Sequence, residues 1–214
     1  MIISKLHYIS QGNSPEEHLL NIQKACSSGA ELVQLRIKNI SEKKYLKFAK
    51  EARDITSHFQ TRLILNDHYK IAKDIKADGV HLEKTDFCPT IAMEYLYAWQ
   101  IIGATATTLN QCEVLINKKV DYIRLSPFKS GIKKDNSPIA LGLKGYTVIV
   151  DALKTETPII ASGGITTLDV KDILATGISG IGVSEEITRD FNSIKTFNKL
   201  LNTSSADELR HTFE

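Results

Sequence analysis

No hydrophobic run in this 214-residue sequence is long enough to cross a bilayer, which takes about 20 apolar residues in a helix. The sequence also lacks an apolar N-terminal stretch flanked by basic residues and followed by a small-residue cleavage site. Positive charge is not in excess, since the net charge is +2 and no lysine or arginine run forms a patch. We therefore expect a cytoplasmic protein with neither a membrane nor a nucleic acid as partner.

Cysteine is scarce, with single residues at Cys26, Cys88 and Cys112. The three are far apart, odd in number and match no C-x-x-C spacing, which argues against a zinc site or a disulfide framework. We interpret them as buried or incidental thiols in a reducing compartment.

A G-x-G-x-x-G loop is missing after the first expected strand, which argues against an open dinucleotide-binding sheet. The sequence instead contains short apolar runs that alternate regularly with amphipathic segments. These runs are apolar on both faces, as is typical of parallel strands buried on both sides. They lie at residues 6–10, 32–37, 62–66, 79–82, 100–105, 122–126, 158–163 and 180–184.

Helical patterns separate these runs. Ser14 and Pro15 form a typical helix start, and another start lies at residues 41–44. Eight strands that alternate with eight helical segments predict an α/β protein, a single-domain (β/α)₈ TIM barrel over residues 1–203. Residues 204–214 are polar and are expected to form a C-terminal tail or a frayed helix.

The active site of such a barrel lies at the C-terminal ends of its strands. The second run ends in Gln34, Arg36 and Lys38, which the alternation of a strand sends to one side. Because an arginine can fork onto phosphate oxygens, this strand end is a candidate anion site. A solvated strand end is the alternative, but inward polar side chains are costly to bury without a role.

Two carboxylates follow neighbouring strands. Asp67 comes directly after Asn66, and Asp86 lies four residues past Leu82. Hard oxygen ligands at adjacent strand ends suit Mg²⁺, which typically takes one or two carboxylates and completes its shell with water and substrate phosphates. The alternatives are a helix N-cap for Asp67 and a turn before Pro89 for Asp86.

Glycines accompany the last two strands. Gly163 and Gly164 follow the seventh run, and Gly182 precedes Val183 and Ser184 in the eighth. Glycines let the backbone approach a ligand closely, so bare N–H groups there can receive a phosphate. A pair of tight turns is the alternative, and the position at strands 7 and 8 favours phosphate.

Other polar side chains are less distinctive. The Thr105 hydroxyl is a candidate hydrogen-bonding group, and Lys129, Lys133 and Lys134 of the loop after the sixth run would meet phosphate or keep that loop soluble. We interpret His81, inside an apolar run, as a satisfied core histidine. Nothing resembles a Ser-His-Asp triad or a zinc cluster.

Seven motifs occur in order along residues 6–187. They are Gln34-Leu35-Arg36-x-Lys38, Asn66-Asp67, Gly79-Val80-His81-Leu82 with Asp86, Ile102-Gly103-x-Thr105, Asp121-Tyr122-Ile123, Gly163-Gly164-Ile165 and Gly182-Val183-Ser184. This series resembles the thiamine-phosphate synthase family. The resemblance implies a TIM barrel that joins hydroxymethylpyrimidine pyrophosphate to a thiazole phosphate, which yields thiamine phosphate and pyrophosphate.

The resemblance also implies roles for individual residues. Asp67 and Asp86 would hold Mg²⁺, while the thiazole phosphate would bind at Gly163, Gly164, Val183 and Ser184. The pyrimidine pyrophosphate would bind Gln34, Arg36, Lys38, Asn66, Thr105 and Lys133, of which Arg36, Lys38, Thr105 and Lys133 would be catalytic. Catalysis would then rest on electrostatics and positioning, because pyrophosphate must leave before the thiazole nitrogen attacks.

The chain departs from the family pattern in three places. Glu83 and Lys84 stand where the family usually has Gly-Gln after the fourth strand. The loop 128–134 is shortened and lacks the usual threonines, so Lys133 is the best match for the pyrophosphate-binding lysine, with Lys134 close behind. Glutamates at 185 and 186 follow Ser184, where small residues are usual.

Two other functions stay open at this point. A thiazole tautomerase relative shares the barrel but generally lacks the metal carboxylates and uses a histidine after the fifth strand, which residues 105–108 do not contain. A non-catalytic phosphate-binding barrel with a regulatory role is the other alternative, suggested by the altered loop after the sixth strand. The resemblance leaves a monomer or a homodimer open, and a homodimer is favoured.

Overall fold

The computed structural model describes residues 2–83, 88–129 and 139–211, with side chains up to residue 202. Within these ranges the chain forms eight short strands. They are β1 (Leu6–Ile9), β2 (Leu32–Leu35), β3 (Arg62–Asn66), β4 (Gly79–Leu82), β5 (Ile101–Ala106), β6 (Tyr122–Leu125), β7 (Ile159–Ser162) and β8 (Gly180–Val183). Each lies within one of the expected runs or extends it by one residue, because each run is long enough only for a strand.

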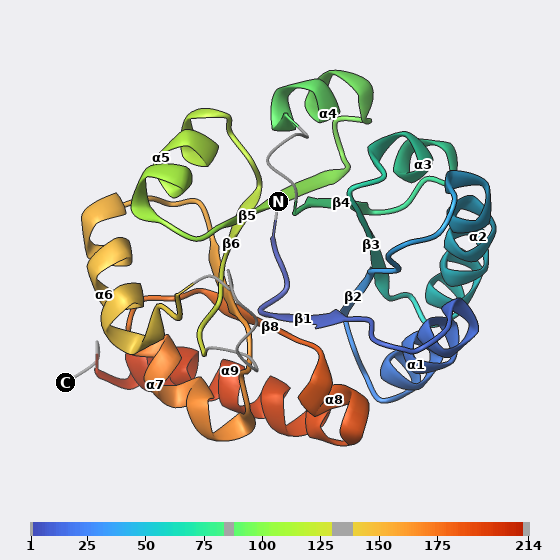
Figure 1. The fold of residues 1–214 in the computed structure, drawn as a ribbon. Helices are drawn as coiled ribbons and strands as arrows, with labels where there is room; N and C mark the ends of the chain where they lie inside the picture. Colours follow the sequence, from blue (N-terminus) through green and yellow to red (C-terminus); the bar gives the residue numbers. More distant parts are fainter. Residues whose placement is uncertain (1, 84–87, 130–138, 212–214) are drawn as a thin grey trace.

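The strands close into a barrel in the order β1 to β8, with every neighbouring pair parallel. The first and last strands pair through Tyr8 and Val183. Figure 1 looks into this barrel and shows the helices arranged around it. The prediction of a (β/α)₈ TIM barrel is confirmed.

Helices connect successive strands. Ser14 caps α1 by accepting a hydrogen bond from the backbone N–H of Glu17, and Pro15 occupies the first turn, as the sequence indicates. The helices are α1 (Pro15–Ser27), α2 (Glu42–His58), α3 (Tyr69–Asp74), α4 (Pro89–Tyr95), α5 (Leu109–Asn117), α6 (Gly142–Leu153), the 3₁₀ turn η1 (Thr167–Asp169), α7 (Val170–Leu174), α8 (Glu185–Arg189) and α9 (Ser193–His211).

The inside of the barrel changes character along the strands. Leu32, Ile64, Ile101, Tyr122 and Ile160 form an apolar cluster there. Two residues further along four of these strands, on the same face, the side chain is polar. These polar residues are Gln34, Asn66, Arg124 and Ser162. The barrel is therefore apolar towards its N-terminal end and polar where the strands end.

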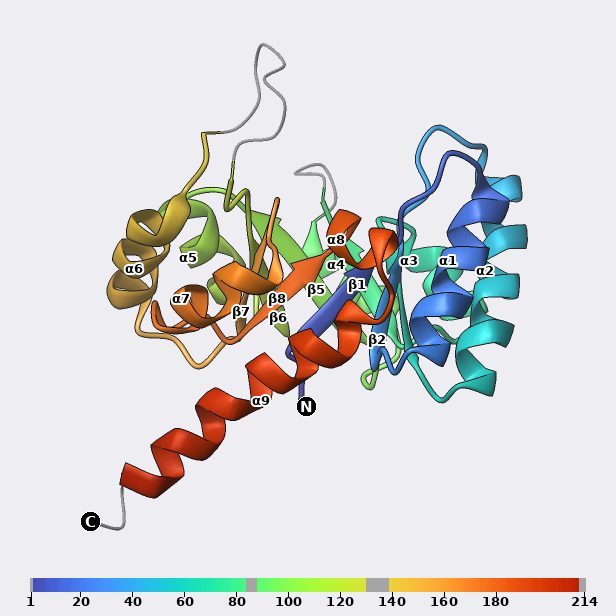
Figure 2. The ribbon, with the colours of Figure 1, turned by 90° about the horizontal axis from the view of Figure 1, so that it is seen from below.

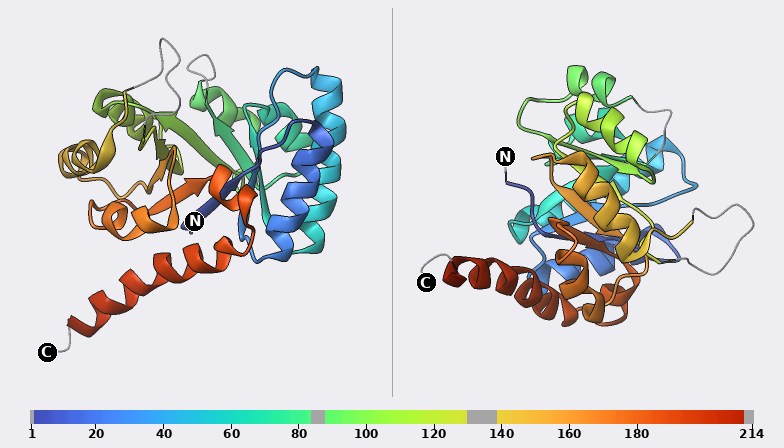
Figure 3. Two further views of the ribbon diagram at one scale, coloured as in Figure 1. Left: turned by 60° about the horizontal axis from the view of Figure 1, so that its bottom comes forward. Right: turned by 90° about the vertical axis from the view of Figure 1, so that its left-hand side faces the viewer.

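The C-terminal helix continues beyond the expected end of the barrel at residue 203. Ile194, Phe197 and Leu201 of α9 are buried, and the helix runs to His211. Figures 2 and 3 show its last turns projecting away from the barrel. None of the helices in the described part of the chain is long and apolar enough to span a membrane.

Candidate functional site

A cavity of about 1150 Å³ opens at the carboxyl ends of the strands. Seven predicted site residues line it: Arg36, Lys38, Thr105, Gly163, Gly164, Val183 and Ser184. The described residues that line the cavity do not include Gln34, Asn66 or Asp67. Hydrogen bonds join these three to one another, and Asp67 also binds the backbone of Glu83. Asp86, Lys133 and Lys134 fall outside the described residues. One cavity therefore brings Arg36 and Lys38 of the first predicted anion site together with the glycine turn of the second, whereas Gln34, which was expected beside them, does not line it.

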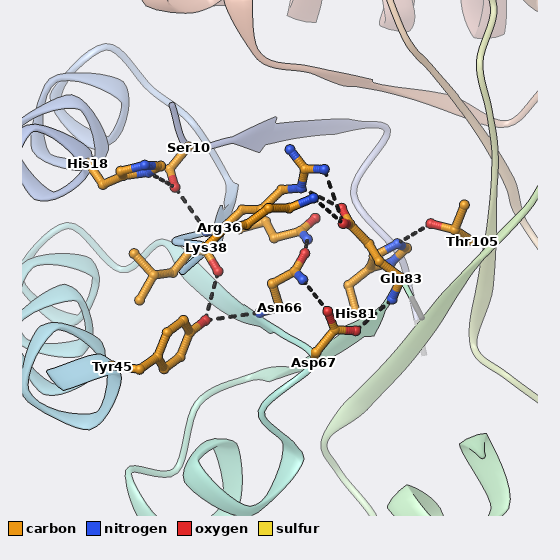
Figure 4. A network of polar contacts seen from close by, with 12 residues as sticks. Ser10, His18, Arg36, Lys38, Tyr45, Asn66, Asp67, His81, Glu83 and Thr105 are labelled. Atoms are coloured by element: carbon orange, nitrogen blue, oxygen red, sulfur yellow. Dashed lines mark hydrogen bonds and ion pairs between the residues drawn. The ribbon is translucent and has the colours of Figure 1, made fainter. Parts of the chain in front are cut away.

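Arg36 and Lys38 are held by a carboxylate of the protein (Figure 4). Glu83 Oε1 lies 2.5 Å from Arg36 Nε and Oε2 lies 3.1 Å from Arg36 Nη2. Lys38 Nζ is 3.5 Å from Glu83 Oε2. Burial acts to raise the pKa of Glu83, but the hydrogen bonds and charge of Arg36, with Lys38, lower it overall. Glu83 is therefore ionised at neutral pH and partly neutralises both cations.

A chain of hydrogen bonds runs behind this ion pair. Gln34 Nε2 donates to Asn66 Oδ1 at 2.6 Å, and Asn66 Nδ2 donates to Asp67 Oδ2 at 2.7 Å. The other oxygen of Asp67 accepts the backbone N–H of Glu83 at 2.7 Å. The chain thus couples the end of β2 to the segment after β4 and sets the position of Glu83 (Figure 4).

Asp67 does not act as a helix N-cap. The N-cap position of α3 is His68, which makes no side-chain cap bond, and its ring lies against Tyr45. Each oxygen of Asp67 accepts one hydrogen bond and so keeps acceptor capacity. The carboxylate fits Mg²⁺ by its chemistry. No cluster of three or more His, Cys, Asp or Glu that suits a metal occurs among the described residues.

His81 is a satisfied core histidine, as the sequence indicates. Its Nδ1 shares a hydrogen bond of 2.9 Å with the hydroxyl of Tyr122, and its Nε2 shares one of 2.9 Å with Thr105 Oγ1. Burial, with the charge of Arg124, lowers the pKa of His81 well below its ordinary value, so the ring is neutral. The Thr105 hydroxyl is thereby oriented at the cavity wall.

The Gly163-Gly164 turn requires glycine. Both residues have positive φ, +101° and +70°, a region that other residues rarely adopt. A Cβ on Gly163 would lie 2.9 Å from Pro127 Cβ, and one on Gly164 would lie 3.1 Å from Lys129 Cβ. Lys129 Nζ is paired with Asp169 at 2.7 Å, so this lysine of the loop is already engaged.

Three further residues of the site have no counterpart among the sequence predictions. Ser10 Oγ and His18 Nδ1 share a hydrogen bond of 2.8 Å. Ser10 Oγ also accepts the backbone N–H of Arg36 at 3.0 Å, and this contact holds the backbone of Arg36 in place. Arg124 also lines the cavity. Its signal in the sequence is a charged residue inside the apolar run of β6, two residues after Tyr122.

Known proteins resemble this chain over most of its length. The family model described as thiamine monophosphate synthase matches residues 6–187. A thiamine-phosphate synthase of Flavobacterium psychrophilum is 38% identical over 200 residues, which cover 92% of this chain and 97% of that protein. One of Flavobacterium johnsoniae is 40% identical over 189 residues, which cover 86% and 89%.

A similar fold occurs among solved structures. The thiamine phosphate pyrophosphorylase from Pyrococcus furiosus superposes with a TM-score of 0.78 over 93% of this chain and 96% of that one. The two sequences are 24% identical, so this likeness bears on the fold alone.

Proposed function

This chain belongs to the thiamine monophosphate synthase family, and we propose that it is a thiamine-phosphate synthase, a transferase that joins hydroxymethylpyrimidine pyrophosphate to a thiazole phosphate. One observation carries the proposal. A single cavity presents Arg36 and Lys38 on one wall and the Gly163-Gly164 turn on another. Two phosphorylated substrates that react with each other need two such places within one cavity.

The reaction exchanges one bond for another. The bond between the pyrimidine methylene carbon and the pyrophosphate oxygen breaks, and its electron pair leaves with pyrophosphate. The lone pair of the thiazole nitrogen then forms the new carbon–nitrogen bond. Arg36 and Lys38 stabilise the negative charge that develops on the leaving group, and Thr105 offers a hydroxyl oriented by His81. For this, pyrophosphate must displace Glu83 from both cations.

We propose Mg²⁺ as the cofactor, with Asp67 and Asp86 as its protein ligands. When bound, the ion supplies positive charge to the oxygens of pyrophosphate. Asp67 supports the assignment because it keeps acceptor capacity at the end of β3. Lys133 is proposed as a further pyrophosphate ligand, and Gly163, Gly164, Val183 and Ser184 as the thiazole phosphate site, with Gln34 and Asn66 on the pyrimidine side.

A coupling assay tests the proposed activity. The protein is given both substrates, with Mg²⁺ or with EDTA, while pyrophosphate release and thiamine phosphate formation are followed. Product that depends on Mg²⁺ is expected. Folded protein that binds the substrates without turnover would instead favour the non-catalytic barrel, which the pairing of Glu83 with Arg36 and Lys38 also motivates. Thiazole isomerisation without coupling would indicate a tautomerase.

The proposed partners are two small phosphorylated substrates and a second copy of the chain in a homodimer, in the cytoplasm and without nucleic acid. Light scattering of the purified protein measures its mass. A mass of one chain would contradict the homodimer and leave the proposed reaction untouched.

A further inference from the structure

Arg124 is a buried arginine inside the barrel. It lies in β6 between Ile123 and Leu125, whose side chains belong to the apolar core outside the strands, so strand alternation sends Arg124 to the interior. The residue is 3% exposed and lines the cavity. None of its three guanidinium nitrogens has a hydrogen-bond partner among the described residues.

A guanidinium in such a place is strongly unfavourable when it has no partner, because burial removes its hydration and no hydrogen bond from the described residues replaces it. None of the described neighbouring side chains offers Arg124 a carboxylate that is free of other partners. Burial and Arg124 itself lower the pKa of His7 to about 3, so His7 is neutral. The hydroxyl of Tyr122 is shared with His81. Glu83 interacts electrostatically with Arg124, but its oxygens are bound to Arg36 and Lys38.

The barrel leaves room for this side chain. A Cβ on Gly182, in β8, would lie 3.3 Å from Arg124 Nε, so any other residue there would crowd the guanidinium. Arg36 interacts electrostatically with Arg124, as one cation with another. Nε of Arg124, a residue of β6, therefore lies beside Gly182 of β8, and the guanidinium is close enough to Arg36 for their charges to interact.

We propose that Arg124 is a substrate-binding residue that, together with Arg36 and Lys38, binds the pyrophosphate group of the pyrimidine substrate. The inference rests on the proposed function and adds a cation that neither the motifs nor the family resemblance assigns. A planar guanidinium whose three nitrogens have no partner in the described part of the chain matches two oxygens of one anion. Pyrophosphate is favoured over the monophosphate because its higher charge and greater length let it contact cations on two sides.

Calorimetric titration with inorganic pyrophosphate tests this role without requiring turnover. Arg124→Gln is expected to weaken binding about tenfold or more, and Arg124→Lys, which keeps the charge, to recover part of the loss. Arg62→Gln is the matched control, because Arg62 lies at the start of β3 and its Nη1 donates to the carbonyl of Ile2. The control is expected to bind like the unaltered protein.

Several outcomes would overturn the inference. Unchanged pyrophosphate affinity in Arg124→Gln would do so, as would failure of the unaltered protein to bind pyrophosphate. If Arg124→Gln weakened inorganic phosphate alone, the assignment to pyrophosphate would be wrong. Circular dichroism checks folding, and if Arg124→Gln does not fold, Arg124→Lys and Arg124→Met replace it in the same titration.

Measurements of coupling activity and of pyrophosphate binding together distinguish a failure of the role of Arg124 from a failure of the proposed reaction. Normal coupling with unchanged pyrophosphate binding in Arg124→Gln would remove the role of Arg124 alone. Pyrophosphate binding that depends on Arg124, in a protein without coupling activity, would remove the proposed reaction and keep the binding site.

Discussion

The two walls of the cavity differ in the groups that we propose as anion donors. On the side of β2 and β4 the donors are charged side chains, Arg36 and Lys38, already bound to Glu83. On the side of β7 and β8 they are backbone groups at Gly163 and Gly164, in a turn shaped by positive φ. On the side of β2 and β4, the proposed anion would have to displace the Glu83 carboxylate from Arg36 and Lys38. On the side of β7 and β8, the glycine backbone itself sets the shape of the turn.

This difference has an energetic consequence. The ion pairs around Glu83 keep two cations from standing unpaired beside the buried Arg124, which stabilises the ligand-free protein. Displacing Glu83 then costs part of the binding energy of the incoming pyrophosphate. No protein carboxylate has to leave the Gly163-Gly164 turn. We therefore expect substitution of Glu83 to strengthen anion binding and substitution of Gly164 to weaken it.

Removal of the Asp67 carboxylate is expected to reduce turnover more than any other change considered below reduces binding or stability. Asp67→Ala removes the proposed Mg²⁺ ligand and the acceptor for the backbone N–H of Glu83. We expect turnover in the presence of Mg²⁺ to fall about 100-fold or more, with a retained circular dichroism spectrum. Asp54→Ala, at an exposed position of α2, is the matched control. Full activity of Asp67→Ala would show that the metal assignment is wrong.

Removal of the negative charge of Glu83 is expected to strengthen pyrophosphate binding. Glu83→Gln leaves Arg36 and Lys38 without their carboxylate, so inorganic pyrophosphate no longer has to displace a charge. We expect its dissociation constant to fall about tenfold, which corresponds to about 1.4 kcal/mol. Glu51→Gln breaks a surface pair with Lys47 and is expected to change nothing. Weaker binding by Glu83→Gln would mean that Glu83 assists the ligand.

Substitution in the Gly163-Gly164 turn is expected to weaken anion binding. Gly164→Ala places a Cβ 3.1 Å from Lys129 Cβ at a φ of +70°, which costs about 1–3 kcal/mol of folding free energy. We expect inorganic phosphate to bind about fivefold more weakly, a loss of about 1 kcal/mol, and pyrophosphate to bind as before. Gly29→Ala has φ +94° with nothing within 4 Å. This control should lose stability and keep phosphate binding.

The smallest expected effect is a pH dependence of stability. The pKa of Glu83 in the folded protein lies below its ordinary value of 4.5, so its ion pairs contribute fully above that value. Their contribution is lost as the pH falls through the lowered pKa. Urea unfolding at pH 7 and in strong acid should show that Glu83→Gln loses about 1 kcal/mol less than the unaltered protein. Equal losses would contradict this contribution of Glu83.

Much of the fold could be predicted from local patterns. The eight apolar runs became the eight strands of the barrel, and the Ser14 cap opens α1 where the sequence indicates. These features depend on residues near each other in the chain, such as a cap and the N–H three residues on. For residues 204–214 the polar composition left a frayed helix or a tail open, and α9 runs to His211.

The site was predictable in part. Arg36, Lys38, Thr105 and the Gly163-Gly164 turn line one cavity at the strand ends, and their proposed roles stay predictions. For Asp67 the sequence left an N-cap and a metal ligand open, and the structure excludes the cap because His68 holds that position. The proposed roles of Asp86 and Lys133 stay predictions, since both residues lie outside the described part of the chain.

Local sequence patterns were enough to predict the strands, the inward-facing positions and the strand ends that carry cations, carboxylates or glycines. The way in which these groups pair depends on the folded barrel. The ion pair joins Arg36 and Glu83, which are 47 positions apart, and closure of the barrel sets Arg124 beside Gly182. The physical reason is that charge pairing and burial depend on distances across the barrel, which local patterns in one chain do not specify.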